Sequence, residues 1–220
     1  MEISKVLKTF KDGTMLVEYP DRTTSILDAA QAAEINAKKD MKKTLLVNFY
    51  GGPGTGKSTI CAGVFSKLKW EKVNCEMALE YAKDMVWEGS FNKMDNQIYI
   101  FAKQFHRVFR LLGKVDVILT DSPLLLSLYY GPNEVLFREF VVSEYQKLNN
   151  MDIFLQRMKD YNPAGRMQTL DEAKVIDDKL KTILDQNARG KYLNIVGERE
   201  SEETIANLIL ESLGRNKISR

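Results

Sequence analysis

The sequence predicts an α/β fold, with three layers built around a parallel sheet and a small N-terminal β-hairpin plus helix before it. Residues 45–50 (LLVNFY) form a continuous apolar run, which is typical of a central parallel strand buried on both faces. From this run onward, strand-like and helix-like segments alternate to the end of the chain. A composition with 44% hydrophobic and 28% charged residues excludes a mostly disordered chain.

The N-terminal segment predicts a β-hairpin followed by a helix. Residues 5–10 and 15–19 have the pattern of short strands, and Asp12-Gly13 between them is a strong hairpin-turn signal. We expect the alanine-rich helix that follows to begin at Ser25 as its N-cap, with Asp28 three residues later completing an acidic variant of the capping box.

This segment, residues 1–43, is predicted to be an extension of the main domain at 44–220. The lysine-rich run 38–43 has the composition of a solvated linker. A hairpin and one helix are too small to hold a core alone. We therefore expect the extension to pack on the main domain or to mediate association, for example as a homodimer paired through the hairpin edges.

The main domain is predicted to alternate strands and helices after the first buried strand. Apolar runs and turn signals place further strands at about 72–79, 115–120 and 192–196. Helical periodicity favours helices at about 58–68, 80–87, 97–112, 136–148, 169–187 and 201–213.

The strongest functional signal is the sequence GGPGTGKST at residues 51–59, which matches the pattern G-x-x-x-x-G-K-[ST]. It follows a predicted buried strand and precedes a predicted helix, as this phosphate-binding loop (P-loop) requires. The glycines let backbone N–H groups turn toward anionic oxygens, and the helix N-terminus points its positive end at the same place. We therefore predict a P-loop NTPase fold. The expected nucleotide-binding residues are Gly52, Pro53, Gly54, Thr55, Gly56, Lys57, Ser58 and Thr59.

Two cofactors, ATP and Mg²⁺, follow from this loop. Lys57 is expected to place its charge on the β- and γ-phosphates, and the Ser58 hydroxyl is a metal ligand. A second metal ligand is expected at the end of a neighbouring strand, where Asp121 follows the apolar run VDVILT and precedes Ser122-Pro123. A strand-end helix cap is the alternative role for Asp121. Asp116 lies near the start of the same strand, at the opposite edge, and receives no role.

Phosphoryl transfer also needs a group that orients or deprotonates the acceptor. Glu76 falls within the second predicted strand, whereas Glu80 lies just past its carboxyl end. The direction of the strand therefore favours Glu80 as the catalytic carboxylate. A solvated glutamate in the first turn of a helix is the alternative interpretation.

Several other classes of function are excluded by composition. Two cysteines are too few for a disulfide scaffold or a four-cysteine zinc site. A histidine-based metal site or a Ser-His-Asp triad would depend on His106 alone, the one histidine of the chain. A net charge of +2 gives no support for nucleic-acid binding through bulk charge. No stretch is long and apolar enough for a membrane span, and the N-terminus lacks an apolar signal core, so we expect a cytoplasmic protein without a membrane partner.

These residues together resemble the small P-loop nucleoside and nucleotide kinases over about residues 44–213. Besides the P-loop, the similarity rests on LEYAK at 79–83, LTDSP at 119–123 and a last strand that ends at Val196-Gly197. LEYAK is similar to the Glu-x-Ala-Arg/Lys stretch of ribosylnicotinamide-kinase-type domains. The arrangement is also similar to predicted ATP-binding kinases of tailed phages, which would place the protein in the host cytoplasm.

The resemblance implies further site residues. Kinases of this class carry lid arginines that close on the transferring phosphoryl group, and Arg157 and Arg166 are the candidates here, with ordinary surface charge as the alternative. The helix before the Asp121 strand lines the acceptor pocket in related kinases, which makes Gln104 and Arg107 candidate substrate-binding residues unless they lie on a solvated face. Residues 197–200 (GERE) are similarly expected to surround the adenine of ATP.

Three functions remain open on the sequence alone. The first is an ATP- and Mg²⁺-dependent kinase that acts on a nucleoside, a nucleotide or a related small metabolite. The second is a kinase that phosphorylates a hydroxyl on a polymer, such as a hydroxymethylated base in phage DNA. The third is a P-loop ATPase without a phosphoryl acceptor, although Asp121-Ser122 lacks the adjacent glutamate often seen in ATPases.

Overall fold

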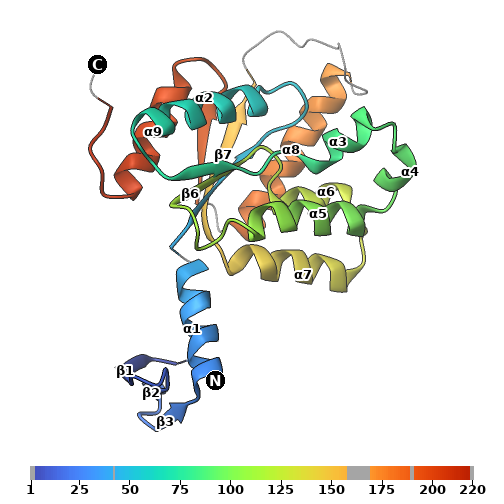
Figure 1. Cartoon of the computed structure of the whole chain (residues 1–220). Helices are drawn as coiled ribbons and strands as arrows, with labels where there is room; N and C mark the ends of the chain where they lie inside the picture. The colour runs from blue at the N-terminus through green and yellow to red at the C-terminus, as the bar shows by residue number, and fades with distance from the viewer. Residues whose placement is uncertain (1–2, 42, 158–168, 189–190, 219–220) are drawn as a thin grey trace. The chain divides into compact units, whose positions relative to one another are not determined.

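The computed structural model of the chain describes residues 3–41, 43–157, 169–188 and 191–218 (Figure 1). The chain divides into two compact units, Met1–Lys43 and Thr44–Arg220. The division falls where the pattern of the sequence changes, just before the apolar run at 45–50. The two units are described separately below.

The first unit is a three-stranded antiparallel sheet with one helix. The strands pair in the order β1-β2-β3, so that β2 is central. Alternate residues of β2, Met15 and Val17, are buried together with Ala32 of the helix, which gives this unit its small core. Its elements are β1 (Lys5–Thr9), β2 (Met15–Glu18), β3 (Thr24–Leu27) and α1 (Ala29–Met41).

The predicted helix start at Ser25 is wrong. Residues 24–27 form β3, and Ser25 pairs with Val17 of the central strand. The N-cap lies three residues later, where the Asp28 carboxylate accepts the Gln31 N–H at 2.8 Å and the Gln31 side chain accepts the Asp28 N–H at 3.1 Å. The capping signal was therefore real but assigned one turn too early. The helix also extends to Met41, so most of the run predicted as a linker is helical.

The second unit confirms the predicted α/β fold with a parallel sheet in the middle layer. Its strands lie in the order β5-β6-β4-β7-β8, and all four neighbouring pairs are parallel. The strands are β4 (Leu45–Tyr50), β5 (Cys75–Met77), β6 (Val117–Thr120), β7 (Asn149–Gln156) and β8 (Tyr192–Val196). The P-loop strand β4 is thus flanked by β6 and β7, which bring the ends of both neighbours to the loop.

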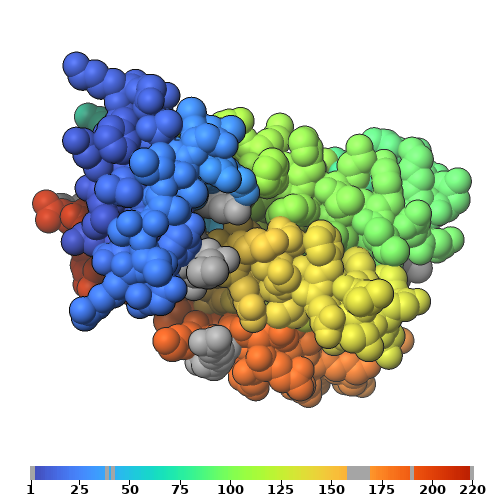
Figure 2. Space-filling view, turned by 90° about the horizontal axis from the view of Figure 1, so that it is seen from below, coloured from blue at the N-terminus to red at the C-terminus, as the bar shows by residue number. Residues whose placement is uncertain are grey.

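Helices cover both faces of this sheet. Figure 1 shows α2 and α9 against one face and α5, α7 and α8 on the opposite side. Figure 2 shows these three helices side by side in green, yellow and orange. The helical elements are α2 (Lys57–Trp70), α3 (Tyr81–Trp87), α4 (Phe91–Met94), α5 (Gln97–Phe109), the 3₁₀ turn η1 (Leu124–Leu126), α6 (Ser127–Tyr130), α7 (Val135–Gln146), α8 (Leu170–Asn187) and α9 (Ser201–Ser212). Within the described parts of the chain, no helix is long and apolar enough to cross a membrane.

The main core lies between the sheet and the α2–α9 layer. Leu45, Val47 and Phe49 of β4 point into it, as expected for alternate residues of one strand. Both cysteines are buried in the same core. Burial raises the pKa of the Cys61 thiol well above its usual range, and that of Cys75 to about 11.

The strand β7 was missed in the sequence, where no strand was predicted between the helices at 136–148 and 169–187. It pairs with β4 along the full length of β4 and places Asp152 opposite Asn48. The Asp152 carboxylate is 5% exposed and accepts hydrogen bonds from the Tyr145 hydroxyl and from the Asn48 amide. A buried acid in a central strand interrupts the apolar pattern, so a continuous run was not visible. Burial raises the pKa of Asp152.

Candidate active site

The P-loop connects the end of β4 to the start of α2. Gly56 adopts a left-handed conformation with φ 88° immediately before Lys57, which turns the chain into the helix. Because the N-cap residue is a glycine, it has no side chain that could cap the first-turn N–H groups. An uncapped helix N-terminus behind a glycine-rich loop is suited to bind phosphate oxygens.

The Lys57 side chain folds back onto the loop. Its Nζ donates to the carbonyl oxygens of Gly51 at 2.6 Å and Gly52 at 3.1 Å. Burial lowers the pKa of Lys57, whereas the carboxylates of Glu80, Asp121 and Asp177 act in the opposite direction. These electrostatic interactions place the ammonium group in the neighbourhood of three carboxylates drawn from three other elements.

Asp121 lies directly after β6, at the edge of the sheet that the sequence predicted. Its Oδ2 accepts a hydrogen bond from the Ser58 hydroxyl at 2.5 Å. Asp121 is only 4% exposed, and within the described residues its second oxygen, Oδ1, accepts no hydrogen bond. A buried carboxylate oxygen without a partner, next to a serine hydroxyl, fits a divalent cation.

The donor set fits Mg²⁺ in particular. The described residues contain no group of three or more His, Cys, Asp and Glu side chains that could hold a metal ion by itself. Mg²⁺ needs no such cage, because it commonly takes one or two protein oxygens and completes its shell with water and nucleotide phosphates. Ser58 and Asp121 would supply those protein oxygens.

Glu80 lies at the N-cap position of α3, between the end of β5 and the helix. Burial raises the pKa of the Glu80 carboxyl above its usual range. Lys57 opposes this shift, and Asp121 adds to it. The nearby Tyr130 hydroxyl interacts with Glu80 electrostatically, and burial first of all raises the pKa of Tyr130 to about 12. Glu80, Lys57 and Asp121 therefore form one electrostatically coupled cluster.

Gln104 and Arg107 of α5 hold the backbone on either side of Glu80. Gln104 is 5% exposed, and its Oε1 accepts the Tyr81 N–H at 2.9 Å. Arg107 donates to the Leu79 carbonyl at 3.0 Å. Both residues thus act on the segment 78–81 in this structure. Their contact with an acceptor molecule stays a prediction.

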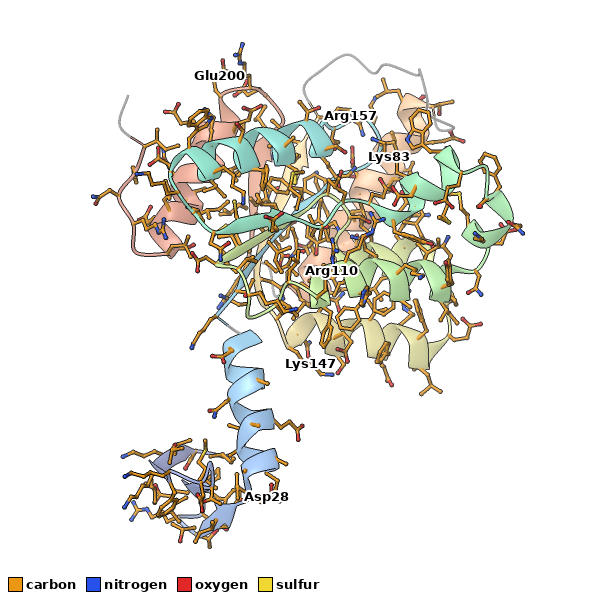
Figure 3. The ribbon with its side chains drawn as sticks, viewed as in Figure 1. Asp28, Lys83, Arg110, Lys147, Arg157 and Glu200 are labelled. Carbon is orange, nitrogen blue, oxygen red and sulfur yellow. The ribbon has the colours of Figure 1, made fainter. Side chains whose placement is uncertain are left out.

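The two predicted lid arginines differ in what the structure describes. Arg166 lies outside the described residues. Arg157 lies just after β7 and is labelled in Figure 3; it donates from Nη1 to the Pro53 carbonyl at 2.7 Å and from Nη2 to the Asp177 carboxylate at 3.1 Å. In this state Arg157 binds the P-loop itself, and its contact with a transferring phosphoryl group stays a prediction.

Asp177 of α8 is the residue that sequence reasoning missed. Its Oδ1 accepts the N–H of Gly52 in the P-loop. No functional residue was predicted on this helix, but Asp177 follows the buried Ile176 and lies between the buried Ala173 and Leu180. The signal in the sequence was an acidic residue next to the apolar positions of an amphipathic helix, which indicates a partly buried carboxylate.

The loop that follows β8 also approaches the P-loop. A Cβ atom on Gly197 would lie 2.6 Å from the Thr55 carbonyl oxygen, so no larger residue fits there without a shift. Residues 197–200, predicted to surround adenine, therefore begin in direct contact with the nucleotide loop. Binding of the base by these residues stays a prediction.

A family comparison agrees with this geometry. The family model described as AAA domain (AAA_28) matches residues 46–201, well over half of the 220-residue chain. The chain belongs to this AAA-domain family. The match covers the P-loop and every strand of the parallel sheet, apart from Leu45 at the start of β4. A search of the curated proteins finds no match to this AAA domain.

A solved structure with a TM-score above 0.6 shows the same fold. The AAA domain is similar to the NadR protein in its crystal structure in complex with NR, with a TM-score of 0.62 and 14% identity over 87% of this chain and 60% of that one. The chain thus spans less than two thirds of the NadR chain. It is also similar to shikimate kinase from Acinetobacter baumannii in complex with shikimate, with a TM-score of 0.45 and 12% identity over 80% of this chain and 98% of that one. The predicted resemblance to P-loop nucleotide kinases is confirmed at the level of the fold.

Proposed function

We propose that this protein is an ATP- and Mg²⁺-dependent kinase that transfers the γ-phosphoryl group to a nucleoside, a nucleotide or a related small metabolite. The observation that carries the proposal is the cluster of Lys57, Asp121 and Glu80. Lys57 is required for nucleotide binding and Asp121 for metal binding. Glu80 is a third charged group, from a different strand end, and it is available for the acceptor.

Each residue has a distinct role in this mechanism. The P-loop N–H groups and Lys57 hold the phosphates and compensate the charge that develops on the transferred group. Ser58 and Asp121 hold Mg²⁺, which supplies further charge compensation on the phosphate oxygens. Glu80 orients the acceptor hydroxyl and takes its proton as the acceptor oxygen bonds to the γ-phosphorus and ADP leaves. When the acceptor is itself a phosphate, Glu80 acts on its orientation only.

Two observations favour a kinase that acts on a small molecule. An ATPase would need a group that activates water next to the metal-binding aspartate, and the residue after Asp121 is Ser122. The similar NadR structure contains NR, which supports a small acceptor of that kind for this chain.

The test is a phosphoryl-transfer screen with γ-labelled ATP and Mg²⁺ on the full chain. The acceptor panel contains nucleosides, nucleoside monophosphates, ribosylnicotinamide and DNA with and without hydroxymethylated pyrimidines. We expect label on a small acceptor, and loss of transfer in Lys57→Ala with an unchanged circular-dichroism spectrum. Lys67→Ala, at the far end of the same helix, is the matched control and should transfer phosphate at the normal rate.

The other outcomes of the screen have clear meanings. Label that appears only on DNA would mean that the protein phosphorylates a polymer and not a small molecule. Release of free phosphate with no labelled acceptor would favour an ATPase. Normal transfer by Lys57→Ala would contradict the assignment of the P-loop as the catalytic nucleotide site.

A further inference from the structure

The P-loop receives a carboxylate from a helix that is distant in the sequence. Asp177 of α8 accepts the Gly52 N–H through Oδ1 at 2.5 Å and the Arg157 guanidinium through Oδ2 at 3.1 Å. The ion pair is well shielded, since the Asp177 side chain is 13% exposed and that of Arg157 is 11% exposed. Burial of a charged pair at this level requires that both partners keep their hydrogen bonds.

The contact between α8 and the loop is also a close packing contact. A Cβ atom on Gly52 would lie 2.7 Å from Asp177 Oδ1 and 2.8 Å from the Ala173 carbonyl oxygen. The backbone of the helix therefore touches the backbone of the loop, and only glycine fits between them. A shift of α8 toward the loop would therefore displace Gly52.

Arg157 closes a ring of hydrogen bonds around one peptide segment. It pairs with Asp177 at one nitrogen and donates to the Pro53 carbonyl at 2.7 Å with the other. Lys57 binds two further carbonyls of the same segment, those of Gly51 and Gly52. Residues 51–53 are thus held by side chains from α2, α8 and the end of β7.

We propose that Asp177 is a positioning residue of the P-loop, and that with Arg157 it holds Gly52 and Pro53 in the conformation that receives the nucleotide. This inference deepens the proposed function and rests on it. A loop that already has its bound shape loses less conformational entropy when a ligand binds, so Asp177 increases the affinity for ATP. The hydrogen bonds of Asp177 go to the Gly52 N–H and to Arg157, and its effect should therefore fall on binding more than on the chemical step.

The test compares three variants of the full chain. Asp177→Ala removes both hydrogen bonds, whereas Asp177→Asn keeps an oxygen for the Gly52 N–H and loses the charge opposite Arg157. Asp178→Ala is the matched control, because Asp178 is the next residue on the same helix and its side chain is exposed. The dissociation constant for ATP with Mg²⁺ is measured by titration with a fluorescent ATP analogue, together with the melting temperature of each unliganded variant.

We expect Asp177→Ala to weaken ATP binding about tenfold, the size of one lost charge-assisted hydrogen bond. Asp177→Asn should fall between this variant and the wild type, and Asp178→Ala should stay within about twofold of wild type on the same scale. In turnover, KM for ATP should rise while kcat changes less. Arg157→Ala should weaken ATP binding as Asp177→Ala does. The double variant should bind ATP no more weakly than the single variant of lower affinity, because both residues act on one segment.

Three results would overturn the inference. The first is an unchanged or tighter ATP affinity in Asp177→Ala. The second is a double variant whose loss of ATP affinity equals the product of the losses in Asp177→Ala and Arg157→Ala. The third is a lower melting temperature without a loss of ATP affinity. If Asp177→Ala does not fold, Asp177→Asn carries the same comparison. If the wild type binds no ATP, the proposed function fails, and the inference is then tested by the NMR chemical shift of the Gly52 amide. A change in this chemical shift in the Asp177 variants but not in Asp178→Ala supports the contact, and an unchanged chemical shift overturns it.

Discussion

The Ser58 hydroxyl donates a hydrogen bond to Oδ2 of Asp121 over 2.5 Å and so links the first turn of α2 to the end of β6. The two residues are 63 positions apart in the sequence, and the parallel pairing of β4 with β6 brings them together. One carboxylate oxygen is thus oriented by the P-loop, while the other stays buried with no donor among the described residues.

Asp121→Asn should impair catalysis through loss of the metal. An amide is neutral and a weak ligand for Mg²⁺, so we expect a rate of phosphoryl transfer about 10²–10³-fold lower. A higher Mg²⁺ concentration should be needed for half-maximal rate. The measurement is the initial rate as a function of Mg²⁺ concentration.

Asp116→Asn is the matched control for this substitution. Asp116 lies just before the same strand, at the other edge of the sheet, where it pairs with Arg215 at 3.6 Å. Its Mg²⁺ dependence should equal that of the wild type. A shared shift in both variants would mean that Asp121 acts through the stability of the strand.

The pH dependence of the rate should report on Glu80. Because burial raises the pKa of this carboxyl, Glu80 becomes protonated at a higher pH than an ordinary glutamate. A protonated carboxyl accepts no proton, so kcat/KM for a hydroxyl acceptor should fall as the pH is lowered through the raised pKa. Glu80→Gln should be about 10²–10⁴-fold slower, and its profile should lack this acidic limb.

Glu76→Gln supplies the comparison for Glu80. Glu76 lies within β5, and its exposed side chain pairs with Lys69 at 3.2 Å. This variant should keep both the rate and the acidic limb. An acidic limb that persists in Glu80→Gln would assign the titration to another group.

Gln104→Leu should destabilise the segment that carries Glu80. The substitution leaves the Tyr81 N–H without its acceptor, and we expect a loss of about 1–3 kcal/mol in the free energy of unfolding. Urea denaturation measures this loss, and His106→Leu, an exposed site on the same helix, is the control. An unchanged unfolding free energy in Gln104→Leu would show that the bond contributes nothing net.

Stability should depend on pH through Asp152. Its folded-state pKa is raised by burial, so between the ordinary and the raised value the folded state binds more protons than the unfolded state. The contribution of Asp152 to stability therefore falls as the pH rises through that window. In Asp152→Asn this slope should disappear, which urea titrations between about pH 4 and about pH 8 would show.

The control for Asp152 is Asp171→Asn, whose side chain is 93% exposed. It should keep the slope of the wild type. Because Glu80 is also buried and contributes a slope of the same sign, the informative quantity is the difference between wild type and variant at each pH. A difference that does not change with pH would contradict the assignment to Asp152.

The parts of the fold that the sequence predicted are those with local signals. A few consecutive residues were enough to recognise the run at 45–50, the glycines of the P-loop and the polar end of β6. The strand β7 was not predicted because it contains Asp152, and a buried acid is compatible with a central strand only when Tyr145 and Asn48 supply its hydrogen bonds. These hydrogen bonds join separate elements, so no local sequence pattern indicates them.

The same distinction applies to the site. Lys57, Ser58 and Asp121 were predicted from their motifs, and the structure places Ser58 and Asp121 in contact. Asp177 was not predicted, because its contact with Gly52 spans 125 residues. Arg107 was predicted to bind substrate from its position on a helix, whereas its bond to the Leu79 carbonyl depends on how α5 packs against the end of β5.

Both cysteines are enclosed in the core between the sheet and the α2–α9 layer, and this has a practical consequence. Alkylating reagents attack the thiolate, which burial disfavours at Cys61 and at Cys75. The native thiols are therefore silent toward maleimide while the core is closed, and their alkylation rate reports how often it opens. A single cysteine introduced on the surface could accept a fluorophore selectively, with both native thiols left in place.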